Sequence, residues 1–148
     1  MPAEKQTNRR YRLPTEEEWE YACRAGTTTP YYFGQTISQQ QANFSVPDLG
    51  SRFPRGNNLD RTTPVGHYSP NKFGLYDMHG NLGQWCEDLY GPYQNDLRNP
   101  NTYQGYVVRG GHWGIPGICC RSAARDKGSP GSKYGGFRVA VSVGSETQ

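Results

Sequence analysis

The stretch of sequence that decides the fold is RLPTEEEWEYA at residues 12–22. Pro14 keeps the chain before it extended, because a residue preceding proline is excluded from the helical region. Thr15 and Glu18 have the spacing of a capping box, in which each side chain satisfies the other residue's backbone N–H. Glutamates fill the first turn, where the helix dipole favours negative charge. The stretch therefore predicts a helix that begins directly after Thr15.

This helix also has a recognisable buried face and a recognisable end. Trp19, Ala22 and Cys23 fall at positions i, i+3 and i+4, which places them on one apolar stripe. Gly26 follows the stripe, as expected of a residue that closes a helix. Both features predict a helix with a structural role.

The remainder of the chain predicts a loop-rich domain. From residue 27 to residue 70 no helical or strand period persists, apart from a short helix predicted at residues 38–42. Segments of this kind usually bind something or are held by a ligand or metal. Later alternating patterns predict strands at residues 82–88, 106–109, 120–125 and 136–141. There is neither a repeat nor a linker, so we expect a frayed segment at 1–10, one domain at 11–141 and a tail at 142–148.

The composition supports a folded chain with little regular structure. Its 148 residues suit a single domain. Hydrophobic residues make up 33% and the mean hydropathy is -0.91. Disordered chains have few aromatic residues, whereas this chain has 13%, together with 19 glycines and 11 prolines. Turns and large flat side chains are therefore expected to build the fold.

Charge and hydropathy argue against several classes of function. The net charge is +3, and the densest basic group, Arg9, Arg10 and Arg12, belongs to no nucleic-acid-binding motif. No apolar run approaches the ~20 residues of a membrane helix, so no membrane insertion is expected. The polar first ten residues lack a signal-peptide pattern, which makes the cytoplasm the default compartment. The four cysteines are accordingly expected to be free thiols.

Five phrases in one order carry a resemblance to a known family. They are RLPTEEEWEYA at 12–22, TPVG at 63–66, NKFGLYDMHGN at 71–81, RGGHW at 109–113, and CRSAAR at 120–125 with GFRV at 136–139. Together they resemble the C-terminal half of the formylglycine-generating enzyme, or sulfatase-modifying factor, family. The resemblance implies an α+β, loop-rich fold of the C-type lectin kind. The opening portion of the family's domain is nearly absent, which favours a partner or an oligomer at uncovered strand edges.

The resemblance also sets an expectation about oxidase chemistry. Enzymes of the family oxidise a substrate cysteine with copper(I), held by two cysteines that lie after the Gly-Gly pair and are separated by about four residues. Here Cys119 and Cys120 are adjacent, and neighbouring side chains of a strand point to opposite faces. We therefore expect Cys120 to be buried and Cys119 exposed, with no bound copper. An oxidase with a degenerate or displaced cysteine site is the alternative function.

The histidines do not replace that site. Another branch of the family uses histidine-bound iron, but those histidines lie in a separate upstream domain. His67, His79 and His112 show no spacing typical of a metal site. The pair Gly110-Gly111 is expected to be a tight packing site and not a phosphate cradle.

Structural calcium is implied by the resemblance at two sets of loop residues. The first set comprises Asp77, Gly80, Leu82 and Gln84, with Gln84 standing where the family usually has glutamate. The second set comprises Asn43 and Asn57, with the carbonyls of Phe44 and Leu59. Calcium accepts such mixtures of hard oxygen ligands. The alternative for both sets is turn chemistry without a metal.

The C-terminal stretch suggests a binding surface. Its framework resembles the family, whereas the gaps between framework residues carry unusual apolar and small residues. Such a pattern resembles the variable proteins of diversity-generating retroelements, in which adenine-targeted mutation alters asparagine codons; ordinary drift is the alternative. Most of these gap residues are reachable from an asparagine codon, although Lys127 is not. The residues expected to bind a protein or another surface ligand are His112, Gly114, Ile115, Gly117, Ile118, Cys119, Asp126, Lys127, Ser129, Ser132 and Tyr134.

Overall fold

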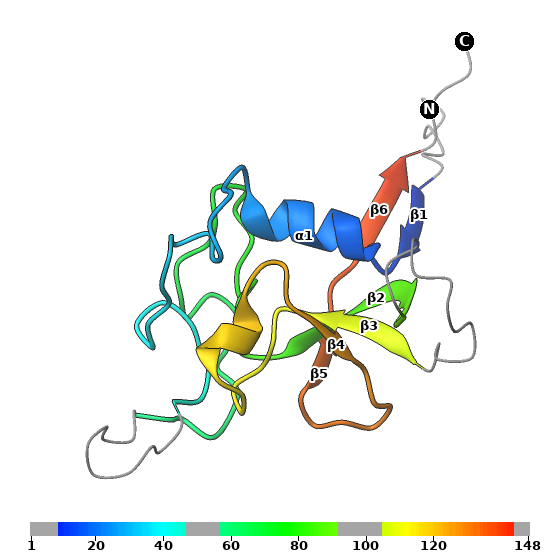
Figure 1. The fold of residues 1–148 in the computed structure, drawn as a ribbon. Helices are drawn as coiled ribbons and strands as arrows, with labels where there is room; N and C mark the ends of the chain where they lie inside the picture. Colours follow the sequence, from blue (N-terminus) through cyan, green and yellow to red (C-terminus); the bar gives the residue numbers. More distant parts are fainter. Residues whose placement is uncertain (1–8, 47–56, 92–104, 144–148) are drawn as a thin grey trace, which may run out of the picture.

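One helix and a small sheet organise the chain, with long loops around them (Figure 1). The structure is a computed structural model that describes residues 9–46, 57–91 and 105–143. Helix α1, Glu16–Arg24, packs on strands of a four-stranded sheet, and a separate two-stranded sheet stands beside the start of the helix. None of the described helices is long and apolar enough to cross a membrane.

Helix α1 forms as the capping signals predict. The Glu18 N–H donates to Thr15 Oγ1 at 3.1 Å, and the Thr15 N–H donates to Glu18 Oε2 at 2.9 Å. Both oxygens of Glu18 also accept from the guanidinium of Arg12 at 2.6 Å. At the other end Ala25 already adopts a left-handed backbone (φ 46°), so the helix closes one residue before Gly26, whose φ is 88°.

The four-stranded sheet has the order β4-β3-β2-β5. Strands β2 (Gly83–Leu89) and β3 (Tyr106–Arg109) are antiparallel and confirm the strands predicted at 82–88 and 106–109. Strand β4 (Arg125–Lys127) pairs antiparallel with β3, and β5 (Gly135–Phe137) pairs parallel with β2. The sheet therefore ends in two short edge strands, β4 and β5.

The strand predicted at 120–125 is wrong. A 3-10 helix, η2 (Gly117–Cys120), occupies the start of this region, and β4 begins only at Arg125. The Cys119 N–H donates to the carbonyl of Pro116 at 2.9 Å, which closes the turn. Residues i and i+3 eclipse in a 3-10 helix, so Gly117 and Cys120 both face the core.

The strand predicted at 136–141 is interrupted. Strand β6 (Ala140–Val143) leaves the four-stranded sheet and pairs with β1 (Arg9–Arg12). Between β5 and β6 the side chain of Arg138 turns inward and donates to Gln84 Oε1 at 2.6 Å. The pairing of β1 with β6 extends the fold beyond the predicted limits 11–141, to residues 9 and 143. The rest of the predicted frayed segment and tail, 1–8 and 144–148, lies outside the described residues.

The helix predicted at residues 38–42 is also wrong, because this segment forms a single turn. The N–H groups of Gln41 and Ala42 both donate to the carbonyl of Ser38. The side chain of Gln41 accepts from the Ser38 N–H at 3.0 Å, a local bond that competes with helix propagation. The turn directs Ala42 into the core.

Two apolar clusters form the core. The first joins α1 to the sheet through Trp19, Cys23, Met78, Cys86 and Val107. The second lies under the loops and comprises Tyr31, Ala42, Phe44 and Cys120.

Buried ion pairs also join the helix to the sheet. Arg109, with an exposed fraction of only 2%, donates to Glu20 Oε2 at 2.5 Å. Arg125 forms a bidentate pair with Glu16 at 2.6 and 2.8 Å. Charge-assisted, two-pronged pairs of this kind fix geometry as well as adding energy. They hold β3 and β4, and therefore the loops that follow them, in a constant position.

Candidate ligand-binding surface

The surface begins at a pair of glycines that lie against the core. Gly110 has φ 88°, and a Cβ there would lie 3.0 Å from the indole of Trp19. Gly111 has φ 71°, and a Cβ there would lie 2.6 Å from Cys120 Sγ. Only glycine fits both the backbone conformation and the space. The expected role of Gly110-Gly111 in tight packing is confirmed.

The chain beyond the glycines is fixed by backbone hydrogen bonds to distant loops. The Trp113 N–H donates to the carbonyl of Asn81 at 3.1 Å, and the Ser45 N–H donates to the carbonyl of Ile115 at 2.9 Å. Ile115 is partly buried against the second core cluster. The loop that carries the expected ligand-binding residues is therefore attached to a rigid scaffold.

Most of the expected residues line two adjoining cavities. The larger, of about 650 Å³, takes in His112, Ile115, Ile118, Cys119 and Asp126. The smaller, of about 200 Å³, is lined by the expected residues His112, Asp126, Lys127, Ser129, Ser132 and Tyr134. Both cavities share Val108, His112 and Asp126. The fold thus brings residues that are far apart in the sequence onto one continuous hollowed surface.

Aromatic rings pack against one another in one part of this surface. The rings of His112 and Tyr134 stack with centroids 4.0 Å apart, and Trp113 lies 4.9 Å from Tyr134. The ammonium group of Lys133 lies 5.3 Å from the Trp113 ring and 5.1 Å from the Tyr134 ring. Stacked rings with a cation over them lose little conformational entropy on binding.

The charges of the surface are mixed. Burial lowers the pKa of His112, and the nearby carboxylate of Asp126 partly opposes that effect. The imidazole is therefore kept neutral near pH 7, which suits its stacking on Tyr134. Arg125 lines the larger cavity while its guanidinium pairs with Glu16. Arg121 is exposed there, with its Nε donating to the carbonyl of Ile118 at 2.9 Å.

Two glycines of the expected set have different positions. Gly114 is exposed, and a Cβ there would meet the Tyr134 ring at 3.0 Å. Gly117 is buried, and a Cβ there would lie 2.9 Å from Ile37 Cγ2 and 3.0 Å from the Phe44 ring. The carbonyl of Gly117 also accepts from the hydroxyl of Tyr31 at 2.8 Å. Gly117 therefore lies in the core under the surface and, unlike most of the expected ligand-binding residues, lines neither cavity.

Several lining residues were missed in the sequence. Trp85 lies under the smaller cavity, Val108 lies between the cavities, and Arg121 lines the larger one. The indole of Trp85 approaches β5 closely, since a Cβ at Gly135 would lie 3.0 Å from its indole nitrogen, a contact that no local pattern reveals. Glycines in otherwise regular strands often mark the close approach of a large side chain.

The two adjacent cysteines lie in different surroundings. Cys119 is exposed and Cys120 is buried, as expected, although they lie on η2 and not on a strand. Burial raises the pKa of the Cys120 thiol to about 12, which disfavours the thiolate that binds copper. Within residues 9–46, 57–91 and 105–143, no three His, Cys, Asp or Glu side chains are grouped to hold a metal. All four cysteines are free thiols.

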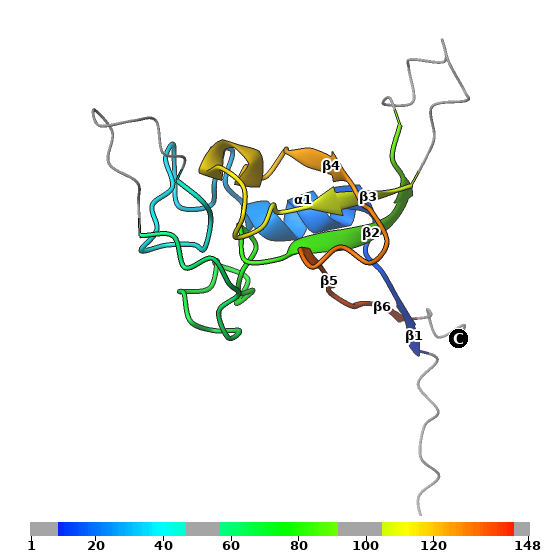
Figure 2. The same ribbon diagram turned by 90° about the horizontal axis from the view of Figure 1, so that it is seen from below.

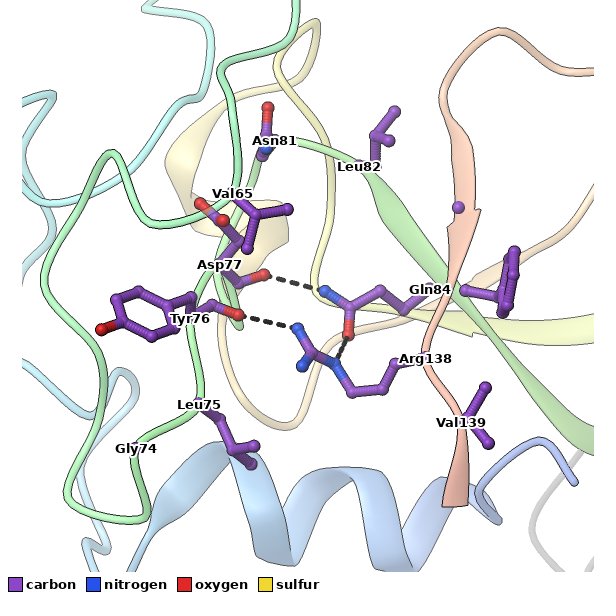
Figure 3. A pocket seen from close by; sticks show the side chains of 12 residues that line it. Val65, Gly74, Leu75, Tyr76, Asp77, Asn81, Leu82, Gln84, Arg138 and Val139 are labelled. Carbon is purple, nitrogen blue, oxygen red and sulfur yellow. Dashed lines mark hydrogen bonds between the residues drawn. The ribbon is translucent and has the colours of Figure 1, made fainter. Parts of the chain in front are cut away.

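The first calcium set does not fit the ion. Gln84 Oε1, the expected ligand, already accepts from Arg138 Nε at 2.6 Å (Figure 3) and from Trp19 Nε1 at 2.7 Å. The other end of the amide, Gln84 Nε2, donates to the carbonyl of Asp77 at 2.8 Å. The guanidinium of Arg138 thus supplies a positive charge beside the expected ligand. Burial raises the pKa of Asp77, and its Oδ2 has no partner among the described residues.

The second calcium set is brought together by the fold. Asn43, Phe44, Asn57 and Leu59 line one cavity of about 230 Å³. The side-chain nitrogen of Asn43 donates to the carbonyl of Arg61 at 2.8 Å, a bond typical of turn chemistry. The expected ligands are all neutral, whereas calcium sites in proteins usually include carboxylates. Calcium at this set stays a prediction.

The fold and the packing of the Gly-Gly pair against the core are those of a sulfatase-modifying-factor type of domain. Residues 3–143 match the family model "Sulfatase-modifying factor enzyme 1-like domain", and the chain belongs to this family.

Three relatives show how far the similarity extends. Serine/threonine-protein kinase pkn1 of Chlamydia caviae is 40% identical over 144 residues, covering 89% of this chain and 21% of the kinase. The formylglycine-generating enzyme of Streptomyces coelicolor is 35% identical over 144 residues, covering 87% of this chain and 46% of the enzyme. The solved structure of Treponema denticola variable protein 1 has a TM-score of 0.66 and 32% identity, covering 87% of this chain and 46% of that one. The chain thus spans less than half the length of these relatives.

Proposed function

We propose that this chain is a non-catalytic binding module that presents a ligand surface on a C-type-lectin-like scaffold. The observation that carries the proposal is the convergence of gap residues between 112 and 134 on two adjoining cavities. Loops held by a rigid framework are a common location for binding sites.

The chemistry of the surface suits a protein ligand. Tyr134 and Trp113 offer large, stiff contact areas, whereas Ser129 and Ser132 offer small adaptable hydrogen-bonding groups. This combination of aromatic anchors and small polar residues is typical of antibody-like paratopes. The apolar side chain of Ile118, which is 59% exposed, provides a further contact that the fold itself does not use.

Similarity to Treponema denticola variable protein 1 supports a variable surface of the retroelement type. In such a surface the framework stays constant and only exposed positions change. The exposed positions Gly114, Ile118, Cys119 and Asp126 meet this requirement. A reverse transcriptase gene with an asparagine-rich template repeat beside the coding sequence would support the assignment.

Tolerance to substitution tests the proposal directly. We would randomise the exposed positions Ile118, Asp126, Ser129 and Ser132 together with the half-buried Tyr134, display the library, and select binders to a model protein such as lysozyme. Most members should keep the wild-type unfolding transition, and selected members should bind with differing specificity. The matched control replaces Gly111 by alanine, which the packing against Cys120 forbids. Loss of folding across the library, as severe as in the control, would sink the proposal.

An oxidase with a displaced cysteine site is the second candidate, favoured by 35% identity to a formylglycine-generating enzyme. Copper(I) binding by the reduced chain, compared with the double variant Cys119→Ser and Cys120→Ser, separates the two functions. We expect no tight binding in either protein. Tight binding that disappears in the double variant but persists in Cys86→Ser would support the oxidase.

A further inference from the structure

The floor of the smaller cavity lies on the face of the sheet that turns away from helix α1. On β2, Gln84 accepts from Trp19 of the helix, and Cys86 belongs to the core cluster that joins helix and sheet. Alternation along the strand therefore directs Trp85 to the opposite face. The loop between β4 and β5 joins strands at opposite edges of the sheet and crosses this face in front of β2 (Figure 2). Trp85 thus lies between the sheet and the loop.

The indole of Trp85 presents a hydrogen-bond donor to this cavity. A Cβ at Gly128 would overlap the ring, and a Cβ at Gly135 would lie 3.0 Å from its Nε1, so the two glycines leave the ring its space. Trp85 lines the cavity, and its indole N–H has no acceptor among the described residues. Because a buried tryptophan N–H normally has a partner, a ligand that fills the cavity is expected to bring an acceptor.

His112 presents a second donor. Its Nδ1 accepts from the Gly114 N–H at 3.1 Å, so in the neutral ring the proton lies on Nε2. Stacking on Tyr134 fixes the direction of the ring, and within the described ranges the Nε2–H has no acceptor. The hydroxyl of Ser132 accepts from the Tyr134 N–H at 3.3 Å and keeps its own proton for a ligand. Donors from three segments of the chain therefore converge on one small cavity.

Positive charge dominates the rim of the two cavities. Arg121 lines the larger cavity, Lys127 lines the smaller, and Lys133 lies over the aromatic rings of the same surface. None of the three is paired with a carboxylate of the described residues. Among the lining residues of both cavities that the structure describes, Asp126 is the only acidic one. The surface therefore offers a ligand more cations than anions.

These cations and donors belong to constant positions, whereas the carboxylate belongs to a changeable one. Adenine-targeted mutation of an asparagine codon produces neither Lys127 nor Lys133, but it does produce Asp126. Arg121 belongs to a framework phrase, and Trp85 lies on β2, outside the stretch of gap residues. A surface that varies in this way keeps its positive charge and its indole donor in every variant.

A cationic side chain fits the smaller cavity less well than an anion. Aromatic rings attract cations, and His112, Tyr134 and Trp85 all line the cavity. However, the Lys133 ammonium already lies 5.1 Å from the Tyr134 ring, and Lys127 lines the cavity itself. A second cation would meet both ammonium groups, so the charges favour an anion.

We propose that the ligand surface selects acidic protein segments, with one carboxylate side chain bound in the smaller cavity between Trp85 and His112. The inference rests on the proposed function and names the kind of partner that the same surface takes. A volume of about 200 Å³ is below the range of pockets for whole small molecules and suits a single side chain. The two N–H groups bind the carboxylate oxygens, while the Lys127 ammonium balances the charge.

Selection from a library of short random peptides tests the charge preference of the full chain. We expect the selected peptides to be rich in aspartate and glutamate, and to bind about ten-fold more weakly when asparagine and glutamine replace these residues. Selected peptides without such a preference would overturn the inference and leave the proposed function standing. A library that yields no binder at all would remove the proposed function as well.

A pair of charge variants then separates the cavity from the general charge of the chain. Lys127→Glu should weaken binding of the selected peptides about ten-fold or more, because a carboxylate then faces that of the ligand. Lys72→Glu is the matched control, since it makes the same change of charge at an exposed position that lines neither cavity. It should leave the affinity within about two-fold, because solvent and salt screen distant charges. Equal weakening in both variants would contradict a carboxylate site in the cavity.

Trp85→Phe tests the donor, because it keeps an aromatic ring and removes the N–H. We expect about three- to ten-fold weaker binding of the selected peptides, the usual effect of one lost hydrogen bond. Tyr106→Phe is the matched control: its ring packs edge-on against Trp85 but does not line the cavity. Unfolding midpoints of both variants show whether they are folded. Unchanged affinity in a folded Trp85→Phe variant would overturn the assignment of the carboxylate to this cavity.

Discussion

His79 illustrates how one buried side chain can join loops that are distant in the sequence. Its Nε2 accepts from the Tyr32 N–H at 3.1 Å, so Nδ1 must carry the proton that it donates to the carbonyl of Cys120 at 2.7 Å. The ring also stacks on Tyr32 with centroids 4.9 Å apart. Burial lowers the pKa of His79 to about 4, and the hydrogen bond to Cys120 only partly opposes this shift. The histidine is structural, and it works only when neutral.

This neutrality makes stability depend on pH in a defined window. The unfolded chain binds a proton at His79 near pH 6.5, whereas the folded chain resists protonation until about pH 4. Stability should therefore fall as the pH decreases through this window, by roughly 3 kcal/mol for a shift of this size. Urea unfolding at a series of pH values measures the slope. His79→Gln should flatten it while His67→Gln should not; an equal slope in His79→Gln would contradict the assignment.

At the scale of elements, helix α1 depends on a local cap as well as on its buried stripe. The Thr15 hydroxyl accepts from the Glu18 N–H, which would otherwise have no partner in the first turn. The Glu18 carboxylate also pairs with Arg12. The hydrogen bond from Arg12 is the largest cause that lowers the pKa of Glu18 to about 2. The cap thus connects the helix to β1.

Removal of the cap should have a measurable cost. Thr15→Ala should lower the free energy of unfolding by about 1 kcal/mol, since one helix N–H loses its acceptor. Thermal or urea unfolding followed by circular dichroism checks the value. Thr15→Ser keeps the hydroxyl and should stay close to wild type. A loss in the serine variant equal to that in the alanine variant would show that the methyl group, and not the cap, is responsible.

Gly117, in η2, and Gly114, in the loop before it, should respond differently to substitution by serine. Gly117→Ser places a side chain against Ile37 and Phe44, and overpacking of this kind typically costs about 1–3 kcal/mol. Gly114→Ser meets the rings of Tyr134 and His112, which lie at the surface and not in the core, so its cost should be within about 0.5 kcal/mol. Unfolding free energies of the two variants provide the comparison. Equal losses would mean that Gly114 also belongs to the framework.

Local signals predicted some elements, and tertiary contacts decided the others. The cap at Thr15 and the alternation in β2 are local, so both were readable from the sequence. The break between β5 and β6 depends on Arg138 reaching Gln84, a contact across more than fifty residues that no local pattern reveals. Likewise the ligand surface was predicted from unusual gap residues, whereas Trp85 was missed because its contact with Gly135 is a long-range one.

At the scale of the whole molecule, the two core clusters are joined by a small polar group. Cys23, on α1, lies 3.6 Å from Ser122 Oγ, and its Sγ also lies within 3.9 Å of the His79 ring. Burial raises the pKa of the Cys23 thiol to about 12, so it remains protonated and uncharged. The Ser122 N–H in turn donates to the carbonyl of Pro30 at 2.8 Å. These contacts hold the loops that contain the second cluster against the helix.

The chain should therefore unfold as one cooperative unit despite its long loops. Trp19 reports on the first cluster and Trp113 on the ligand surface, so Trp113→Phe and Trp19→Phe, each in a Trp85→Phe background, allow each region to be followed separately by fluorescence. Coincident urea transitions are expected for both regions, as in two-state domains of this size. Because the four cysteines are free, a reducing agent should leave these transitions unchanged. An earlier transition at the Trp113 region would mean that the ligand surface is attached to a separately unfolding loop layer, which would weaken the case for a rigid scaffold.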